Sequence, residues 1–315
     1  MPAETLTHIE FLCAHVFSSS QSLISMTPFQ KVHEYLRRTG KRPKKRLSQN
    51  FLIDPNVLPV ILEALQIEDA DLVLEIGTGL GYLTKALGDN AKTVVGVEID
   101  SDLYAELQSE SIDHPRIRLV HADFLKLNLF PIFSGVCRPN AKVVGNLPYH
   151  ITTPILWKLL GHHKSIGSCV LMMQTEVAQR VVASPGGKDY GALSVAVSYY
   201  AKSNIIRSFS SNQFYPAPSV DSSLVRLSIE ESPTVEVENE ALFFRILRSA
   251  FQFRRKMLRN AMLRGGLAVS SEVLDDIFDE LRIDGRRRGE TLNILEFASL
   301  ANAVSRITTR TQTAR

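Results

Sequence analysis

The stretch VLEIGTGLG, residues 73–81, decides the fold of this chain of 315 residues. It is a short apolar run that ends in three glycines, Gly77, Gly79 and Gly81, and a helical pattern follows. Glycines after a strand let the backbone turn tightly and approach a ligand closely. Their spacing, GxGxG, differs from the GxGxxG of dinucleotide-binding proteins, and the Lys-Ser/Thr pair of a phosphate-binding P-loop does not follow. The turn therefore indicates neither of these two nucleotide-binding classes.

Outward from this turn, strand-like and helix-like segments alternate. Strands are expected at residues 72–76, 93–99, 117–120, 142–145, 169–173, 205–209 and 224–229. Helices are expected at residues 81–87, 101–110 and 153–160. This alternation predicts an α/β fold with a Rossmann-like, doubly wound sheet. Later helical patterns, at residues 239–263, 271–281 and 292–304, predict a smaller all-helical C-terminal domain.

Composition shifts divide the chain into three regions, residues 1–43, 44–231 and 232–315. The first is an extension that is flexible and then basic. Its serine-rich run, residues 18–22, predicts a flexible arm, and Met26 is an alternative start of translation. Residues 1–30 lack Lys and Arg, so neither a secretory signal nor a mitochondrial transit peptide is expected.

The segment at residues 31–46 is strongly basic, with Glu34 as its one acid. This density indicates an anionic partner, most simply nucleic acid, although a solvated basic linker would show the same composition. The whole chain has a net charge of only +3, with 44% hydrophobic and 22% charged residues, which is typical of a soluble globular protein. We therefore expect a cytoplasmic protein without a membrane span.

Metal and disulfide chemistry are not expected. The three cysteines, Cys13, Cys137 and Cys169, have no clustered spacing, and the histidines are scattered. Such spacing suits neither a disulfide framework nor a thiolate or imidazole metal site.

Two acids follow predicted strands at the edge where such sheets bind ligands. Glu98 ends the second strand, roughly 20 residues after the glycine turn, where an acid can accept both ribose hydroxyls. Together with the GxGxG turn, this position favours an adenosine ligand without a pyrophosphate, which points to S-adenosylmethionine. The alternative is a purely structural turn in which Glu98 faces the solvent. Asp123 follows the third strand and can accept a hydrogen bond from the adenine amine, although a helix N-cap would also place an acid there.

The stretch GNLPY, residues 145–149, ends the fourth strand. An exocyclic adenine amine is a poor nucleophile because its lone pair is delocalised into the ring. The side-chain oxygen of Asn146 and the backbone carbonyl of Leu147 or Pro148 can hold the amine hydrogens and localise that lone pair. Proline stiffens the loop, and Tyr149 offers a ring on which an extruded base can stack. These residues predict methyl transfer by in-line displacement, with no metal and no covalent enzyme intermediate.

Further motifs occur in a characteristic order: QNFLID at residues 49–54, VEID at 97–100, YGALSV at 190–195, FYPAPSVDS at 214–222 and RRKMLRN at 254–260. With the two motifs above, the chain closely resembles the small-subunit ribosomal RNA adenine dimethyltransferases, the KsgA family, from residue 44 to residue 304. The resemblance implies N6-dimethylation of two adjacent adenosines near the 3′ end of 16S rRNA. It also implies a pre-assembled small subunit as partner, a role in its biogenesis, and action as a monomer.

The resemblance assigns roles residue by residue. It implies that the methyl donor is bound by Asn50, Leu52, Gly77, Glu98, Asp123 and Asn146, and that catalysis involves Asn146, Pro148 and Tyr149. Basic residues would grip rRNA phosphates: Lys44, Lys45, Arg46, Arg245, Arg248, Arg254, Arg255, Lys256, Arg259, Arg264, Arg286, Arg287 and Arg288. Thr78 stands where the family often has proline, and Ser219 where lysine is frequent.

Two alternatives share these features. A large-subunit rRNA adenine methyltransferase also carries NLPY-like and GxGxG motifs, but the long C-terminal region and the YGALSV motif favour the small-subunit family. A nucleic-acid-binding or ribosome-assembly factor could have kept the fold and lost catalysis. The intact Glu98, Asn146, Pro148 and Tyr149 argue against that loss.

Overall fold

The computed structural model describes residues 26–111, 114–267 and 269–313. A seven-stranded sheet of order β4-β3-β2-β5-β6-β9-β7 forms its centre. The strands are β2 (Leu72–Ile76), β3 (Thr93–Glu98), β4 (Ile117–His121), β5 (Ala141–Asn146), β6 (Ser168–Gln174), β7 (Ala201–Phe209) and β9 (Ser222–Ile229). Five of them pair in parallel, and β9 runs antiparallel between β6 and β7. The predicted α/β fold class is confirmed.

All seven predicted strands are present. The largest difference is in β7, which begins four residues before the predicted start at Ile205. Its pairing with β9 continues through Lys202 and Asn204. Polar residues of this kind carry no apolar alternation, so the sequence pattern could not reveal them.

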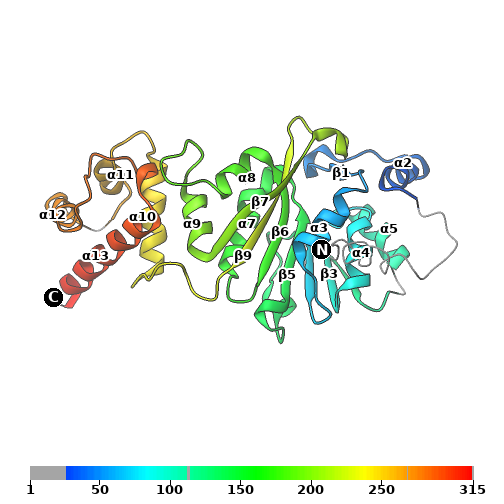
Figure 1. Ribbon diagram of the computed structural model, residues 1–315, viewed down its shortest axis with the longest axis horizontal. Coiled ribbons are helices and arrows are strands. Elements are labelled where there is room, and N and C mark those ends of the chain that lie inside the picture. Colours follow the sequence, from blue (N-terminus) through cyan, green and yellow to red (C-terminus); the bar gives the residue numbers. More distant parts are fainter. Residues whose placement is uncertain (1–25, 112–113, 268, 314–315) are drawn as a thin grey trace, which may run out of the picture.

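Helices surround the sheet and continue beyond it. They are α2 (Pro28–Thr39), α3 (Val57–Leu65), α4 (Tyr82–Asn90), α5 (Ser101–Ser111), α6 (Phe130–Phe133), α7 (Thr152–Gly161), α8 (Thr175–Val181), α9 (Ala192–Tyr200), α10 (Glu240–Gln252), α11 (Leu258–Arg264), α12 (Ser271–Leu281) and α13 (Ile294–Thr313). Short 3₁₀ turns include η1 (Lys45–Leu47), η3 (Tyr149–Ile151) and η5 (Gly289–Thr291), and β1 (Phe51–Leu52) pairs with β8 (Phe214–Tyr215). Figure 1 shows α10 to α13 at one end of the sheet and α2 at the other. No helix of the described ranges has the length and apolar character of a membrane span.

The helical C-terminal part differs from the sequence prediction in two places. The last helix, α13, ends at Thr313, nine residues after the predicted end at residue 304. The helix expected at residues 239–263 is interrupted between Gln252 and Leu258. The interruption is stabilised from outside, because the Leu258 amide donates to the Arg287 carbonyl at 2.6 Å and the Arg259 amide to the Gly285 carbonyl at 3.0 Å. The apolar core continues from the sheet into α10. The boundary that we place after residue 231 falls between β9 and α10.

The basic N-terminal segment is more ordered than its composition indicates. Residues 28–39 form α2, which begins with a reciprocal capping box between Thr27 and Gln30. Val32 and Tyr35 on this helix are buried against Leu80 and Leu103. The alternative of a solvated basic linker therefore does not hold for residues 28–39, whereas the serine-rich run at residues 18–22 lies outside the described residues.

The strand order reverses around β2, which lies between β3 and β5. Ligands of doubly wound sheets bind outside the carboxyl ends of the strands at such a point. The register brings these ends together, since Ile76 pairs with both Val97 and Gly145. Gly77, Glu98 and Asn146 therefore meet at one edge of the sheet.

At the opposite edge of the sheet, where β2 and β5 begin, Asp71 and Lys142 form a buried ion pair. The nearest carboxylate oxygen lies 2.6 Å from the ammonium nitrogen. Removing one partner leaves the other charge buried and unpaired, which typically costs about 3–5 kcal/mol. We expect Asp71→Asn to lower the free energy of unfolding by roughly this amount in urea denaturation. The double variant Asp71→Asn, Lys142→Met should recover most of the loss, and a double variant as unstable as the single one would contradict this account.

Candidate active site

A cavity of about 180 Å³ opens at the edge where β2, β3 and β5 end. Its wall includes all eight residues to which a donor-binding or catalytic role was assigned: Asn50, Leu52, Gly77, Glu98, Asp123, Asn146, Pro148 and Tyr149. These residues come from separate segments of the chain. The fold thus brings the predicted residues together, while the role of each remains a prediction.

The glycine turn forms the floor of the cavity. Gly77 and Gly81 have φ angles of 77° and 76°, in the left-handed region that glycine adopts without strain. A Cβ atom on Gly81 would lie 2.1 Å from a methyl carbon of Leu107, so space as well as conformation requires glycine there. At Gly77 a Cβ would approach the Asn146 carbonyl to 3.9 Å, which shows how close the turn lies to the catalytic loop.

Glu98 joins the glycine turn to the loop after β3. One carboxylate oxygen accepts the Gly79 amide at 3.0 Å, and the other accepts the Asp100 amide at 2.9 Å. Burial raises the pKa of Glu98, while these two amide hydrogen bonds oppose the shift. Glu98 is only 6% exposed and lines the cavity, and its carboxylate has lone pairs left to accept further hydrogen bonds.

The side-chain amide of Asn146 is oriented by the segment before β1. Its nitrogen donates to the Asn50 carbonyl at 3.0 Å. The opposite orientation would set two oxygens against each other, because a carbonyl can only accept. The Asn146 side-chain oxygen is therefore left as an acceptor beside the cavity.

The structure distinguishes between the two backbone acceptors of the catalytic loop. The Pro148 carbonyl already accepts the Ile151 amide at 3.1 Å and the Thr152 hydroxyl at 3.0 Å. The Leu147 carbonyl accepts no hydrogen bond from the described residues. Its side chain is 1% exposed, and its amide donates to the Met172 carbonyl at 2.9 Å, so the position of Leu147 is fixed.

Tyr149 is half-buried at the rim of the cavity. Its hydroxyl lies 2.8 Å from the hydroxyl of Ser222, the first residue of β9. Burial raises the pKa of Tyr149, so the phenol stays neutral at physiological pH. This contact attaches the hydroxyl end of the Tyr149 ring to the last residue of the FYPAPSVDS motif.

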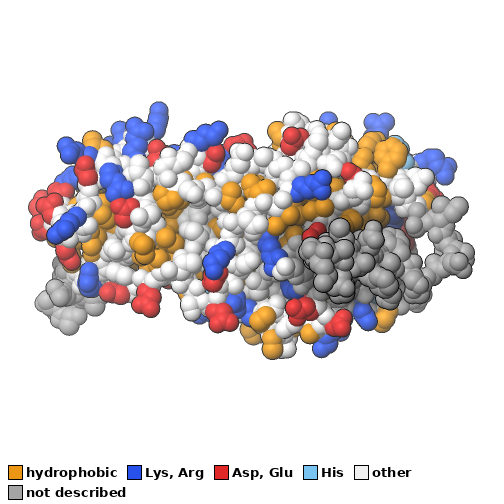
Figure 2. Space-filling view, in the orientation of Figure 1, with side chains coloured by type: hydrophobic (Ala, Val, Ile, Leu, Met, Phe, Trp, Pro, Cys, Tyr) orange, Lys and Arg blue, Asp and Glu red, His pale blue; other side chains and the backbone are white. Residues whose placement is uncertain are grey.

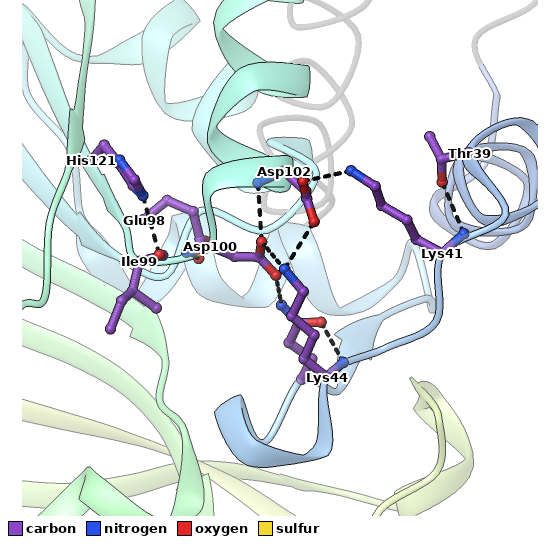
Figure 3. A network of polar contacts seen from close by, with 9 residues as sticks. Thr39, Lys41, Lys44, Glu98, Ile99, Asp100, Asp102 and His121 are labelled. Carbon is purple, nitrogen blue, oxygen red and sulfur yellow. Dashed lines mark hydrogen bonds and ion pairs between the residues drawn. The ribbon is translucent and has the colours of Figure 1, made fainter.

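Basic residues of the N-terminal segment pair with acidic residues on and next to α5 (Figure 3). The Lys44 ammonium lies 2.5 Å from Asp100 and 2.9 Å from Asp102, and Lys41 lies 2.6 Å from Asp102. Hydrogen bonds from Lys41 and Lys44 lower the pKa of Asp102 to about 2. Two further pairs, Lys31 with Glu110 and Arg38 with Glu106, extend this contact along α5.

These pairs correct the role predicted for Lys44. It was expected to contact rRNA together with Lys45 and Arg46, but its ammonium group is occupied by two carboxylates. Asp100 also accepts a hydrogen bond from Gln49 at 2.5 Å. Lys44 therefore fixes the segment at residues 44–52 to the loop that carries Glu98, whereas Lys45 and Arg46 are exposed and have no ion-pair partner among the described residues.

Asp123 is anchored by its own turn. One carboxylate oxygen accepts the Leu125 amide at 2.9 Å, and the other lies 3.8 Å from the Lys126 ammonium. The N-cap alternative for Asp123 does not hold, because residues 124–127 form a turn and the next helix, α6, begins only at Phe130. Phe124, which follows it, is 5% exposed and also contributes to the cavity wall.

Sequence reasoning missed Glu75, which the strand β2 directs into the cavity wall. It is 2% exposed, and within the part of the chain that the structure describes its Oε2 atom has no hydrogen-bond partner. Burial raises the pKa of Glu75 to about 8. The sequence did contain a signal for this residue, because Glu75 is the one acid in an otherwise apolar strand. In the described ranges, no group of three His, Cys, Asp or Glu side chains is placed to hold a metal ion.

Comparisons with known proteins agree on one family. The family model described as ribosomal RNA adenine dimethylase matches residues 40–300. The chain is 42% identical to a ribosomal RNA small subunit methyltransferase A from Moorella thermoacetica over 275 residues, which are 85% of this chain and 95% of the relative.

Two solved structures have a fold similar to that of this chain. A dimethyladenosine transferase from Plasmodium falciparum superposes with a TM-score of 0.67 at 27% identity, over 78% of this chain and 94% of that one. The 23S rRNA methyltransferase ErmE superposes with a TM-score of 0.62 at 25% identity, over 81% of this chain and 100% of that one.

The raised pKa of Glu75 makes the stability of the protein depend on pH. A carboxyl with a pKa of about 8 in the folded state and 4.5 in the unfolded state favours folding most below pH 4.5. This contribution is lost as the pH rises through 8. Glu75→Gln imitates the protonated acid and should therefore be more stable than the wild type at pH 8, with a smaller difference at pH 5.

Thermal or urea unfolding between pH 5 and pH 9, without ligand, measures this difference. Each pKa unit corresponds to about 1.4 kcal/mol, so the gain should be on the order of a few kcal/mol. Glu63→Gln, an exposed change on α3, is the matched control and should be neutral throughout. A pH-independent effect of Glu75→Gln would contradict the assignment.

Proposed function

The chain belongs to the ribosomal RNA adenine dimethylase family, and we propose how its residues divide the work of methyl transfer. The protein is an S-adenosylmethionine-dependent enzyme that dimethylates adenines of small-subunit rRNA. The observation that carries the catalytic assignment is a pair of acceptors at the cavity wall, the Asn146 side-chain oxygen and the Leu147 carbonyl, to which none of the described residues donates a hydrogen bond.

We further propose the finer features of the reaction. The targets are the N6 atoms of two adjacent adenosines near the 3′ end of 16S rRNA, and each receives two methyl groups. The substrate is a pre-assembled small subunit in the cytoplasm, the enzyme acts as a monomer, and the reaction takes part in small-subunit biogenesis. The family membership and the resemblance of the seven sequence motifs support this proposal.

The cavity suits S-adenosylmethionine, which supplies an electrophilic methyl group on a sulfonium when bound. Gly77 leaves open the space that a side chain would fill beside Asn146. Glu98 presents a fixed carboxylate for two vicinal hydroxyls, and Phe124 and Ile99 add apolar surface for a purine. Asn50 and Leu52 close the cavity from the N-terminal side.

The catalytic loop prepares the target amine for attack. In the first transfer Asn146 and Leu147 each accept one N6 hydrogen, which draws the nitrogen lone pair out of conjugation and directs it toward the methyl group. N6 then loses one proton, so in the second transfer a single remaining hydrogen is held by one of the two acceptors. These hydrogen bonds strengthen as the nitrogen becomes tetrahedral, so they stabilise the transition state more than the ground state. Pro148 keeps the loop stiff, and Tyr149 stacks on the extruded base.

Phosphate contacts position the rRNA. Three of the predicted basic residues form ion pairs within the helical part: Arg254 with Glu290, Arg259 with Asp275, and Arg287 with Glu296. These three pairs stabilise the packing of the helices. Arg255 and Lys256 are exposed and have no ion-pair partner among the described residues. Figure 2 shows Lys and Arg side chains along the upper rim of this helical part. We assign the unpaired cations to the rRNA backbone.

The alternatives are weaker. The similarity to the large-subunit enzyme is 25% identity, against 42% for the small-subunit relative. A factor without catalysis would not need two unoccupied acceptors held in place beside the donor cavity.

Asn146→Ala tests the catalytic assignment. We expect the single-turnover rate of methyl transfer to small subunits from unmethylated ribosomes to fall by about 10²–10³, as for the loss of one preorganised hydrogen-bond partner of a transition state. Labelled S-adenosylmethionine at saturating concentration measures the rate, and affinity for the subunits should stay within about twofold of wild type. Asn90→Ala, an exposed change on α4, is the control. A near wild-type rate for Asn146→Ala would favour the non-catalytic alternative.

Lys45→Met with Arg46→Met tests the phosphate contacts. We expect weaker binding of small subunits and a salt dependence whose slope falls by roughly 0.7–0.9 for each lost contact. Lys44→Met is the matched comparison: because Lys44 pairs with Asp100 and Asp102, it should weaken binding of S-adenosylhomocysteine and leave the salt slope unchanged. An unaltered slope in the double variant would mean that Lys45 and Arg46 do not touch RNA.

A further inference from the structure

We propose that Lys158 is a positioning residue for the methyl donor: it fixes the loop at residues 123–127 against α7, so that Asp123 and Phe124 face the adenine. The proposal rests on the function proposed above and assigns a role to a side chain that lies outside the seven sequence motifs of the family. Lys158 lies on α7, two turns after the catalytic loop.

Among the described residues, the Lys158 ammonium forms hydrogen bonds with this one loop alone. Its ammonium nitrogen donates to the carbonyls of Phe124 at 2.7 Å, Leu125 at 3.0 Å and Leu127 at 2.5 Å. The same nitrogen lies 5.3 Å from the centre of the Phe124 ring. An ammonium has three donors, and here each has an acceptor within a single turn of the chain.

The loop is held to the core by the buried Phe124 side chain, and its backbone is attached separately. Within it, the Asp123 carbonyl accepts the Lys126 and Leu127 amides, both at 3.0 Å, and the Asp123 carboxylate accepts the Leu125 amide. These bonds close the turn but do not attach it to the rest of the fold. The Lys158 ammonium binds three carbonyls of this turn, one of which, that of Phe124, also accepts the Leu127 amide at 3.3 Å, and it thereby joins the turn to α7.

The position of Lys158 on α7 explains why this attachment matters for the site. Ile151 and Ile155 contribute to the cavity wall, and Lys158 continues the same helix face at spacings of four and then three residues. At the start of this helix, Thr152 and Ile151 bind the Pro148 carbonyl. One rigid helix thus holds the catalytic loop at its first turn and the adenine loop near its last.

The environment of Lys158 fits a fixed tie more than a solvated cation. Burial lowers the pKa of Lys158, and the nearby Asp123 opposes the shift. No carboxylate pairs with this lysine among the described residues, so its charge is balanced by carbonyl dipoles and by the Phe124 ring. A lysine on the apolar side of a helix was visible in the sequence, but its partners 31–34 residues away were not.

Lys158→Met removes the donors and keeps the length of the side chain. We expect the dissociation constant of S-adenosylhomocysteine, measured by calorimetry, to rise about tenfold, as for lost hydrogen bonds to a charged group. Methylthioadenosine, which has the adenosine part and lacks the amino acid, should lose affinity by the same factor. The KM for S-adenosylmethionine should rise, while kcat at saturating donor stays within about threefold of wild type, because the acceptors of the catalytic loop are untouched.

Two further variants make the result decisive. Lys158→Gln keeps two donors and should fall between wild type and Lys158→Met; it carries the test if the methionine variant does not fold. Lys164→Met, an exposed change just after α7, is the control and should bind both ligands as wild type does. Unchanged affinity for methylthioadenosine in Lys158→Met and Lys158→Gln would overturn the proposal. Wild-type protein that failed to bind S-adenosylhomocysteine would instead overturn the proposed function.

Discussion

The hydrogen bond from the Asn146 amide to the Asn50 carbonyl is the interaction on which the site depends. It joins the end of β5 to the segment before β1, and it decides which atom of the Asn146 side chain faces the cavity. With the nitrogen occupied, the oxygen remains to accept a hydrogen from an adenine amine. The neighbouring Pro148 carbonyl is taken by Ile151 and Thr152, so Leu147 supplies the second acceptor.

This arrangement requires that the segment at residues 44–52 stays in place. Three contacts fix it: Lys44 and Gln49 bind Asp100, and the Ser48 hydroxyl lies 2.8 Å from His150 next to the catalytic loop. Asp100 is two residues from Glu98, and Figure 3 shows that His121 binds the Ile99 carbonyl between them. The wall of the cavity, the ribose-binding acid and the catalytic loop are therefore parts of one connected polar network.

The sequence was sufficient for the sheet and for eight residues of the cavity wall, but not for Glu75. Apolar runs that end in Gly77, Glu98 and Asn146 follow from local pattern, and parallel pairing then places them at one edge. Contacts between distant segments could not be predicted in this way. The charge density around Lys44 hid both the amphipathic pattern of α2 and the pairing with Asp100, which is 56 residues away. The sequence also could not decide between the Leu147 and Pro148 carbonyls. That choice follows from the hydrogen bonds that Ile151 and Thr152 donate to Pro148.

The most direct test of the account is a structure of the enzyme with S-adenosylhomocysteine and an RNA that carries the target adenosine. The measured quantities are the distances from the adenine N6 atom to its acceptors. The account predicts that N6 lies about 2.7–3.2 Å from both the Asn146 side-chain oxygen and the Leu147 carbonyl, with the Asn146 nitrogen still bound to Asn50. An N6 atom bound to the Pro148 carbonyl, or an Asn146 side chain turned away from the base, would contradict it.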